Sequence, residues 1–152
     1  MDGVPRAWRL EPPSPERTTA MAQVGFAHEQ HAGLYGPIYA AIDAVRGGRP
    51  DPDDLEVLVR FLEAGIYCDQ SGYATEAVIR EVRRATRTAE IDARLRDVVL
   101  AAVDGWDRRE FRAFCRLAAS VADDELRAAL HERSERDPRT ARHARWVLDA
   151  IG

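Results

Sequence analysis

The feature that most constrains the fold of this chain is the helical spacing of its apolar residues, which recurs from residue 52 to the C-terminus. The clearest stripe has apolar residues at i, i+3, i+4, i+7 and i+11, namely Leu55, Leu58, Val59, Leu62 and Ile66. Asp51 and Pro52 precede this stripe as a cap and a first-turn proline, and Gly65 ends the helix. Because such a helix is apolar on one face only, it must pack against a neighbour. The pattern predicts an all-α fold.

Five further segments with helical spacing follow, and each has a recognisable start signal. The predicted starts are Ser71, Thr88, Asp107 with Glu110 three residues later, Asp123, and Asp137 with Pro138. Ser, Thr and Asp are common caps, and an acidic residue three positions after a cap gives the form of a capping box. No segment requires a β-strand.

These helices group into pairs of roughly 35 residues, a period that is typical of helical repeat proteins. The predicted pairs span residues 52–86, 88–121 and 123–151. Because no single pair can bury its apolar faces, neighbouring pairs are expected to stack.

Residues 52–151 resemble a HEAT-type helical repeat, most clearly where Asp137, Pro138 and Arg139 start the last helix, followed by small and apolar residues. The small and apolar residues that carry this resemblance after Arg139 are Ala141, Ala144 and Leu148. The resemblance implies a short right-handed stack of antiparallel helical hairpins, an α-solenoid. The turns at 66–73 and 105–107 depart from a regular repeat, so an irregular helical bundle remains the alternative.

The N-terminal part of the chain is less regular. Residues 1–17 are rich in proline and lack periodicity, which predicts a flexible arm, while residues 18–152 are expected to form a single all-helical domain. The elements predicted within 18–48 are a helix around Phe26, a break at Gly33, Gly36 and Pro37, and a second helix up to Val45.

Composition excludes several classes of protein. The net charge is −4. All 22 basic residues are Arg, and a GC-rich, bacterial coding sequence explains this better than a functional requirement for arginine does. No apolar run approaches the roughly 18 residues of a membrane span, and no secretory leader is recognisable. Cys68 and Cys115 lie in apolar surroundings, as expected for reduced thiols in the cytoplasm. His28 and His31 do not complete a zinc-binding motif, so no metal site is predicted. The sequence likewise predicts no cofactor and no catalytic residue.

Arginines and aromatic residues supply the candidate binding surface. Arg80, Arg83, Arg84 and Arg87 follow helical spacing, which predicts one basic stripe. Arg108, Arg109, Arg112 and Arg116 would extend it if their helix lies alongside. Other candidates are Tyr67 and Tyr73 in a helix connection, Trp106 in a turn, and Trp146 off the main apolar stripe. The alternatives are a solvated face partly neutralised by Glu76, Glu81 and Asp97, and tryptophans buried between stacked helices.

These features favour a non-catalytic protein–protein interaction module, either an adaptor or an immunity-type binding protein, whose protein partner the sequence does not identify. The alternative is a HEAT-like nucleic-acid-binding protein similar to the alkylpurine DNA glycosylases, for which Asp107 beside Trp106 is the nearest match to a positioned carboxylate. The negative net charge argues against a nucleic-acid partner. Homo-oligomerisation through the apolar end at Ile151 is a third hypothesis.

Overall fold

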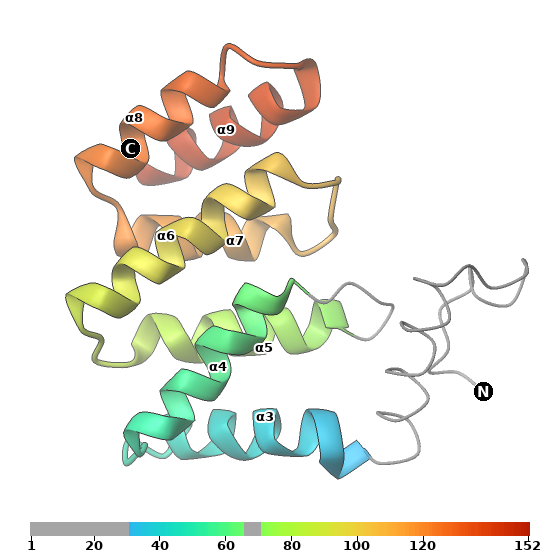
Figure 1. Cartoon of the computed structure of the whole chain (residues 1–152), viewed down its shortest axis with the longest axis vertical. Helices are drawn as coiled ribbons and strands as arrows, with labels where there is room; N and C mark the ends of the chain where they lie inside the picture. The colour runs from blue at the N-terminus through green and yellow to red at the C-terminus, as the bar shows by residue number, and fades with distance from the viewer. Residues whose placement is uncertain (1–30, 66–70) are drawn as a thin grey trace, which may run out of the picture.

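A computed structural model describes residues 31–65 and 71–152, and the helices in these two ranges are labelled as in Figure 1. They are α3 (His31–Arg46), α4 (Pro52–Ala64), α5 (Ser71–Arg84), α6 (Ala89–Asp104), α7 (Phe111–Val121), α8 (Asp124–Arg133) and α9 (Pro138–Ile151). These ranges contain no strand, so the all-α prediction is confirmed. The predicted arm at 1–17, the predicted helix around Phe26, and Tyr67 and Cys68 lie outside the described residues.

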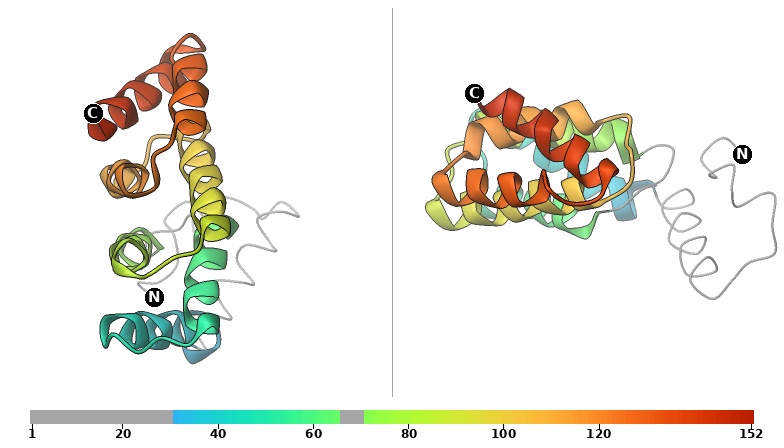
Figure 2. Two further views of the ribbon diagram at one scale, coloured as in Figure 1. Left: turned by 90° about the vertical axis from the view of Figure 1, so that its left-hand side faces the viewer. Right: turned by 90° about the horizontal axis from the view of Figure 1, so that it is seen from above.

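The helices form two layers, which the left view of Figure 2 separates clearly. One layer contains α4, α6 and α8, and the other contains α5, α7 and α9. Helix α3 lies at one end of the stack, where it packs against α4 and α5. Helix α7 packs against α5, α6 and α9, so it contacts helices of both layers.

Several helix ends form where the sequence places them. The hydroxyl of Thr88 accepts a hydrogen bond from the backbone N–H of Ile91 (3.2 Å) at the start of α6. The carboxylate of Asp137 accepts one from the N–H of Thr140 (3.2 Å) at the start of α9. Gly65 ends α4 with φ 61°, a left-handed conformation that glycine adopts without the steric cost of a Cβ atom. These local signals fix the lengths of the helices that then pack together.

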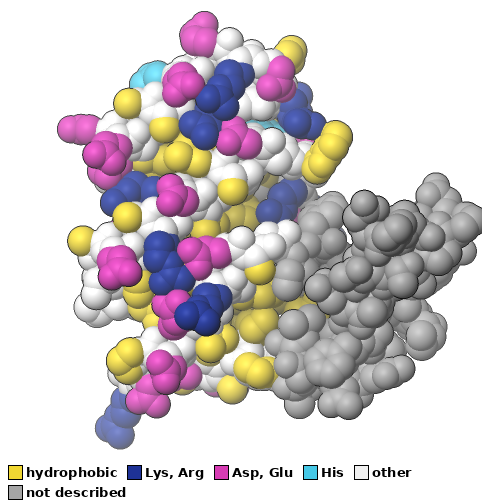
Figure 3. All heavy atoms as spheres, in the orientation of Figure 1, with side chains coloured by type: hydrophobic (Ala, Val, Ile, Leu, Met, Phe, Trp, Pro, Cys, Tyr) yellow, Lys and Arg dark blue, Asp and Glu magenta, His cyan; other side chains and the backbone are white. Residues whose placement is uncertain are grey.

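Ion pairs connect neighbouring helices on the outer face of the α4/α6/α8 layer, where Figure 3 shows arginines beside acidic residues. Arg94 of α6 contacts two carboxylates of α4, Glu56 at 2.7 Å and Glu63 at 2.6 Å. The hydrogen bond from Arg94, with a second from Arg60, holds the pKa of Glu56 at about 2. On this face, therefore, arginine charge is largely compensated within the protein.

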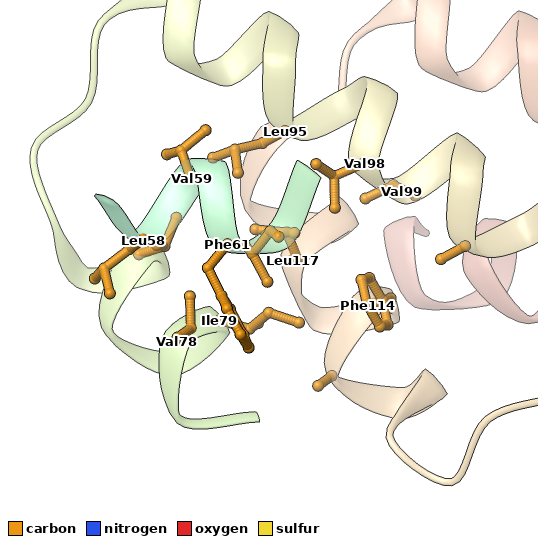
Figure 4. Close-up of a cluster of buried hydrophobic side chains, with 14 of the residues drawn as sticks. Leu58, Val59, Phe61, Val78, Ile79, Leu95, Val98, Val99, Phe114 and Leu117 are labelled. Atoms are coloured by element: carbon orange, nitrogen blue, oxygen red, sulfur yellow. The ribbon is translucent and has the colours of Figure 1, made fainter. Parts of the chain in front are cut away.

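The core lies between the two layers (Figure 4). Its labelled side chains come from four helices: Leu58, Val59 and Phe61 from α4, Val78 and Ile79 from α5, Leu95, Val98 and Val99 from α6, and Phe114 and Leu117 from α7. All of them are buried. Burying one such aliphatic side chain contributes on the order of 2 kcal/mol, so this interface is the main source of stability for the stack.

The predicted break at Gly33, Gly36 and Pro37 is wrong, because α3 runs without interruption from His31 to Arg46 with Pro37 inside it. Proline removes one backbone hydrogen bond and crowds the preceding turn. The helix nevertheless continues, since Ile38, Ile42 and other members of its apolar stripe are buried against α4 and α5. Here the packing of the stripe outweighs the local cost of the proline.

The predicted capping box at Asp107 and Glu110 is also wrong. Helix α7 begins at Phe111, and Glu110 occupies the cap position without a side-chain capping hydrogen bond. The carboxylate of Asp107 is used elsewhere, as an acceptor for His143 and Arg142 of α9. A contact with a distant helix has thus replaced the local cap.

Replacing Pro37 with Ala should stabilise the protein by about 1 to 3 kcal/mol, because the exposed side chain is dispensable and the N–H of residue 37 can then donate to the helix. Urea unfolding monitored by circular dichroism measures the change. Pro52→Ala is the matched control, since Pro52 lies in the first turn of α4, where no intrahelical bond is lost. Equal effects of the two substitutions would contradict this account of α3.

Candidate functional site

A cleft of about 230 Å³ lies between α5 and α7, and we call it the arginine cleft. Its lining combines five guanidinium groups, one carboxylate and two apolar side chains: Arg80, Arg83, Arg109, Arg112, Arg116, Glu76, Ile79 and Ala113. Because α4 and α6 cover the inner side of this layer, the cleft opens on the opposite face from the one shown in Figure 3.

Helical spacing explains why the arginines gather there. Arg80 and Arg83 are one turn apart on α5, and Arg112 and Arg116 are one turn apart on α7, so each pair lies along one helix face. The buried side chains of both helices, such as Leu117, point into the core, which leaves the arginines exposed. Since α5 and α7 pack against each other, the two rows line opposite walls of one cleft.

The charge of this cleft is poorly compensated. Arg80, Arg83, Arg112 and Arg116 make no ion pair or hydrogen bond with any other described residue. The one carboxylate in the lining is Glu76. Guanidinium groups bind carboxylates and phosphates through two parallel hydrogen bonds, so unpaired groups on two walls can hold an anionic ligand from both sides.

Tyr73 lies beside Arg109, which lines the cleft. The Tyr73 side chain is 61% exposed, and the guanidinium carbon of Arg109 lies 4.6 Å from the centre of its ring. This contact places Tyr73, a predicted binding residue, next to the arginine cleft. Tyr67, the second predicted tyrosine, lies outside the described residues.

Arg87 does not belong to the basic stripe, and that part of the prediction is wrong. Helix α5 ends at Arg84, so Arg87 lies in the connection to α6 and folds back. Its guanidinium donates to the carbonyl of Val82 (2.7 Å) at the C-terminal end of α5 and to Asp92 (2.6 Å) of α6. A cation is stabilising at a helix C-terminus, which explains this position. Arg84 lines a separate hollow beside the α3–α4 connection.

Trp106 lies apart from the arginine cleft, in the connection between α6 and α7. Its side chain is 77% exposed, with the guanidinium carbon of Arg139 at 4.5 Å from the ring centre. It borders a hollow of about 490 Å³ that is also lined by Leu62 of α4 and Val98 of α6. Trp146 of α9 is 48% exposed, so neither tryptophan is buried between helices.

His143 is a buried polar residue that the sequence interpretation missed. Its Nδ1 lies 3.0 Å from the carbonyl oxygen of Val103, and its Nε2 lies 2.6 Å from Oδ1 of Asp107. The carbonyl oxygen of Val103 and the ionised carboxylate of Asp107 are both acceptors, so the imidazole is held between two hydrogen-bonding groups. The hydrogen bond from His143, followed by that from Arg142, lowers the pKa of Asp107. His143 thereby ties α9 to α6 and to the connection that precedes α7.

The sequence did contain a signal that the side chain of His143 is buried. It lies three residues after Thr140 and four before Val147, and all three are buried on one face of α9. Its hydrogen-bond partners could not be predicted, because Val103 and Asp107 are 40 and 36 positions away in the chain.

Cys115 is a free, half-buried thiol on α7, close to the cleft. Burial raises its pKa, and the nearby charges of Arg112 and Arg116 lower it less than burial raises it. A thiol in this state is a poor nucleophile.

The described residues contain neither a metal-binding cluster nor a membrane-spanning helix. In residues 31–65 and 71–152, no group of three or more His, Cys, Asp and Glu side chains is placed to hold a metal ion. None of the helices α3 to α9 has both the length and the apolar character needed to cross a membrane.

Comparisons with known proteins found no significant match to any family model, to any curated protein or to any solved structure.

The contribution of Asp107 to stability should depend on pH in a predictable direction. Its folded pKa is lowered from the ordinary value of 3.8, so the contribution is present above pH 3.8 and is lost as the pH falls through the lower folded value. Asp107→Asn should therefore reduce the loss of stability on acidification, as measured by urea unfolding at a series of pH values. Asp149→Asn, on an exposed part of α9, is the control. Parallel curves for wild type and Asp107→Asn would refute this role.

Proposed function

We propose that this chain is a non-catalytic, cytoplasmic protein-interaction module that binds an acidic segment of a partner protein in the arginine cleft. The observation that carries this proposal is the concentration of five guanidinium groups around one carboxylate, on a protein whose net charge is −4. Elsewhere on the described surface, arginines such as Arg94 and Arg133 pair with carboxylates of neighbouring helices.

This contrast argues for binding because clustered like charges oppose one another in the free protein. Arg80, Arg83, Arg112 and Arg116 form no ion pair with other described residues, and a ligand with carboxylate groups would supply the missing partners. Carboxylates spaced along a peptide could contact Arg80 and Arg83 on one wall and Arg112 and Arg116 on the other.

We further propose that the pairs α4/α5, α6/α7 and α8/α9 are HEAT-like repeats. In support, each pair contributes one helix to each layer, and α9 begins with Asp137 as its cap and Pro138 in its first turn. A rigid stack of this kind suits an adaptor or an immunity-type protein, because the binding residues are held on helices.

A nucleic-acid-binding or DNA glycosylase-like role is less well supported. Such an enzyme would need an available carboxylate in a basic groove, whereas Asp107 is held by His143 at 2.6 Å and by Arg142 at 2.7 Å. Asp107 is also absent from the lining of the arginine cleft. The overall negative charge opposes the approach of a long polyanion.

Charge reversal tests the proposal. The variant Arg80→Glu/Arg83→Glu/Arg112→Glu should bind a labelled oligoglutamate peptide at least roughly tenfold more weakly than wild type in fluorescence polarisation, because three charge-assisted contacts become repulsive. Arg84 and Arg87 are left unchanged, since neither lines the cleft.

The matched control is Arg49→Glu/Arg60→Glu/Arg145→Glu, which alters net charge equally at exposed positions outside the cleft. The control should retain binding, and circular dichroism should show unchanged helicity for both variants. Equal weakening of peptide binding in the two variants would show that the loss is caused by the change in net charge and not by the cleft. Tighter binding of duplex DNA than of peptide, with a steep salt dependence, would favour the nucleic-acid alternative.

A further inference from the structure

We propose that the acidic segment carries an aromatic residue, and that this residue is bound in a second hollow between α7 and α9. This inference rests on the proposed function and specifies the chemistry of the partner. The second hollow, which we call the aromatic hollow, has a volume of about 500 Å³. Its lining consists of Arg108, Arg109, Phe111, Arg112, Cys115 and Trp146.

The aromatic hollow and the arginine cleft are adjacent, because they share two lining residues. Arg109 and Arg112 line both of them, so one side of each residue faces α5 and the other faces α9. A ligand that lies across these two arginines can therefore place carboxylates in the cleft and a neighbouring side chain in the hollow. This adjacency favours one extended segment over two separate ligands.

The aromatic wall of the hollow is held in place before any ligand binds. The ring of Phe111 stacks on His143 with a centroid distance of 4.6 Å, and Trp146 lies 5.8 Å from both rings. Hydrogen bonds to Val103 and Asp107 fix the imidazole beneath. A wall that is already ordered loses little conformational freedom on binding, which favours affinity.

The chemistry of the lining selects an aromatic side chain. The ring of Trp146, which is 48% exposed, offers a surface for tilted or stacked ring contacts, while Phe111 is only 4% exposed and lies against it from within the fold. The protonated thiol of Cys115 adds a polarizable, uncharged contact. The surrounding guanidinium groups can also stack on a ligand ring through cation–π contacts. Acidic groups next to the ring are favoured by Arg109 and Arg112, so a peptide with acidic residues beside an aromatic one matches both regions.

The test uses two labelled oligoglutamate peptides that differ only in the central residue, Phe or Ala, with glutamates on both sides so that either chain direction is allowed. Wild type should bind the Phe peptide roughly tenfold more tightly than the Ala peptide in fluorescence polarisation. Trp146→Ala should remove this preference and leave binding of the Ala peptide unchanged. Trp106→Ala, which removes an exposed tryptophan outside both regions, should keep the preference.

A second measurement does not depend on any variant. The Phe peptide, unlike the Ala peptide, should slow alkylation of Cys115 by N-ethylmaleimide, as followed by mass spectrometry of the fragment that contains it. Protection arises because an occupied hollow covers the thiol.

The outcomes separate the two proposals. Equal affinity for the Phe and Ala peptides, with no protection of Cys115, would overturn the aromatic anchor and leave the arginine cleft as the binding site. Failure of wild type to bind either peptide would overturn both proposals. Stronger binding of oligothymidylate than of the Phe peptide at the same salt concentration would reassign both regions to single-stranded nucleic acid, in which bases stack on aromatic residues.

Discussion

The packing of α7 is the constraint on which the rest of the structure depends. Because α7 is enclosed by α5, α6 and α9, its buried face joins the two layers, and only a narrow stripe remains exposed. That stripe carries Arg112 and Arg116, and the turn before it carries Arg109. The same helix therefore holds the core together and brings its arginines against those of α5. A change that moved α7 would alter stability and the arginine cleft at once.

Charge is distributed differently on the two faces of the stack. On the α4/α6/α8 face, interhelical ion pairs such as Arg94 with Glu56 compensate the arginines and contribute to the connection between helices (Figure 3). Such exposed pairs add little stability each, so their main effect is to neutralise that face. In the arginine cleft, Arg80, Arg83, Arg112 and Arg116 form no ion pair with any described residue, and Glu76 is the one carboxylate in the lining. This asymmetry gives the protein one face suited to binding anions despite its negative net charge.

The sequence predicted what depends on local spacing and failed where distant contacts decide. Caps such as Thr88 and the facing rows of arginines follow from helical periodicity, so the helices and most of the cleft were predictable. The continuous helix through Pro37 was not, because burial against α4 and α5 outweighs a local helix breaker. Asp107 was misassigned for a related reason, because it binds His143 of α9, which only the folded stack brings close. Arg87 was misassigned because α5 ends at Arg84, so its guanidinium folds back onto the end of that helix. The aromatic hollow likewise requires α7 and α9 to lie side by side.

The most direct test of the central claim is an NMR titration of the protein with an oligoglutamate peptide, observing the Nε–Hε resonances of individual arginines. The account predicts saturable shifts for Arg80, Arg83, Arg112 and Arg116, because these groups acquire carboxylate partners, and none for Arg60 on the opposite layer. Shifts spread evenly over all arginines, or confined to residues outside the cleft, would contradict it.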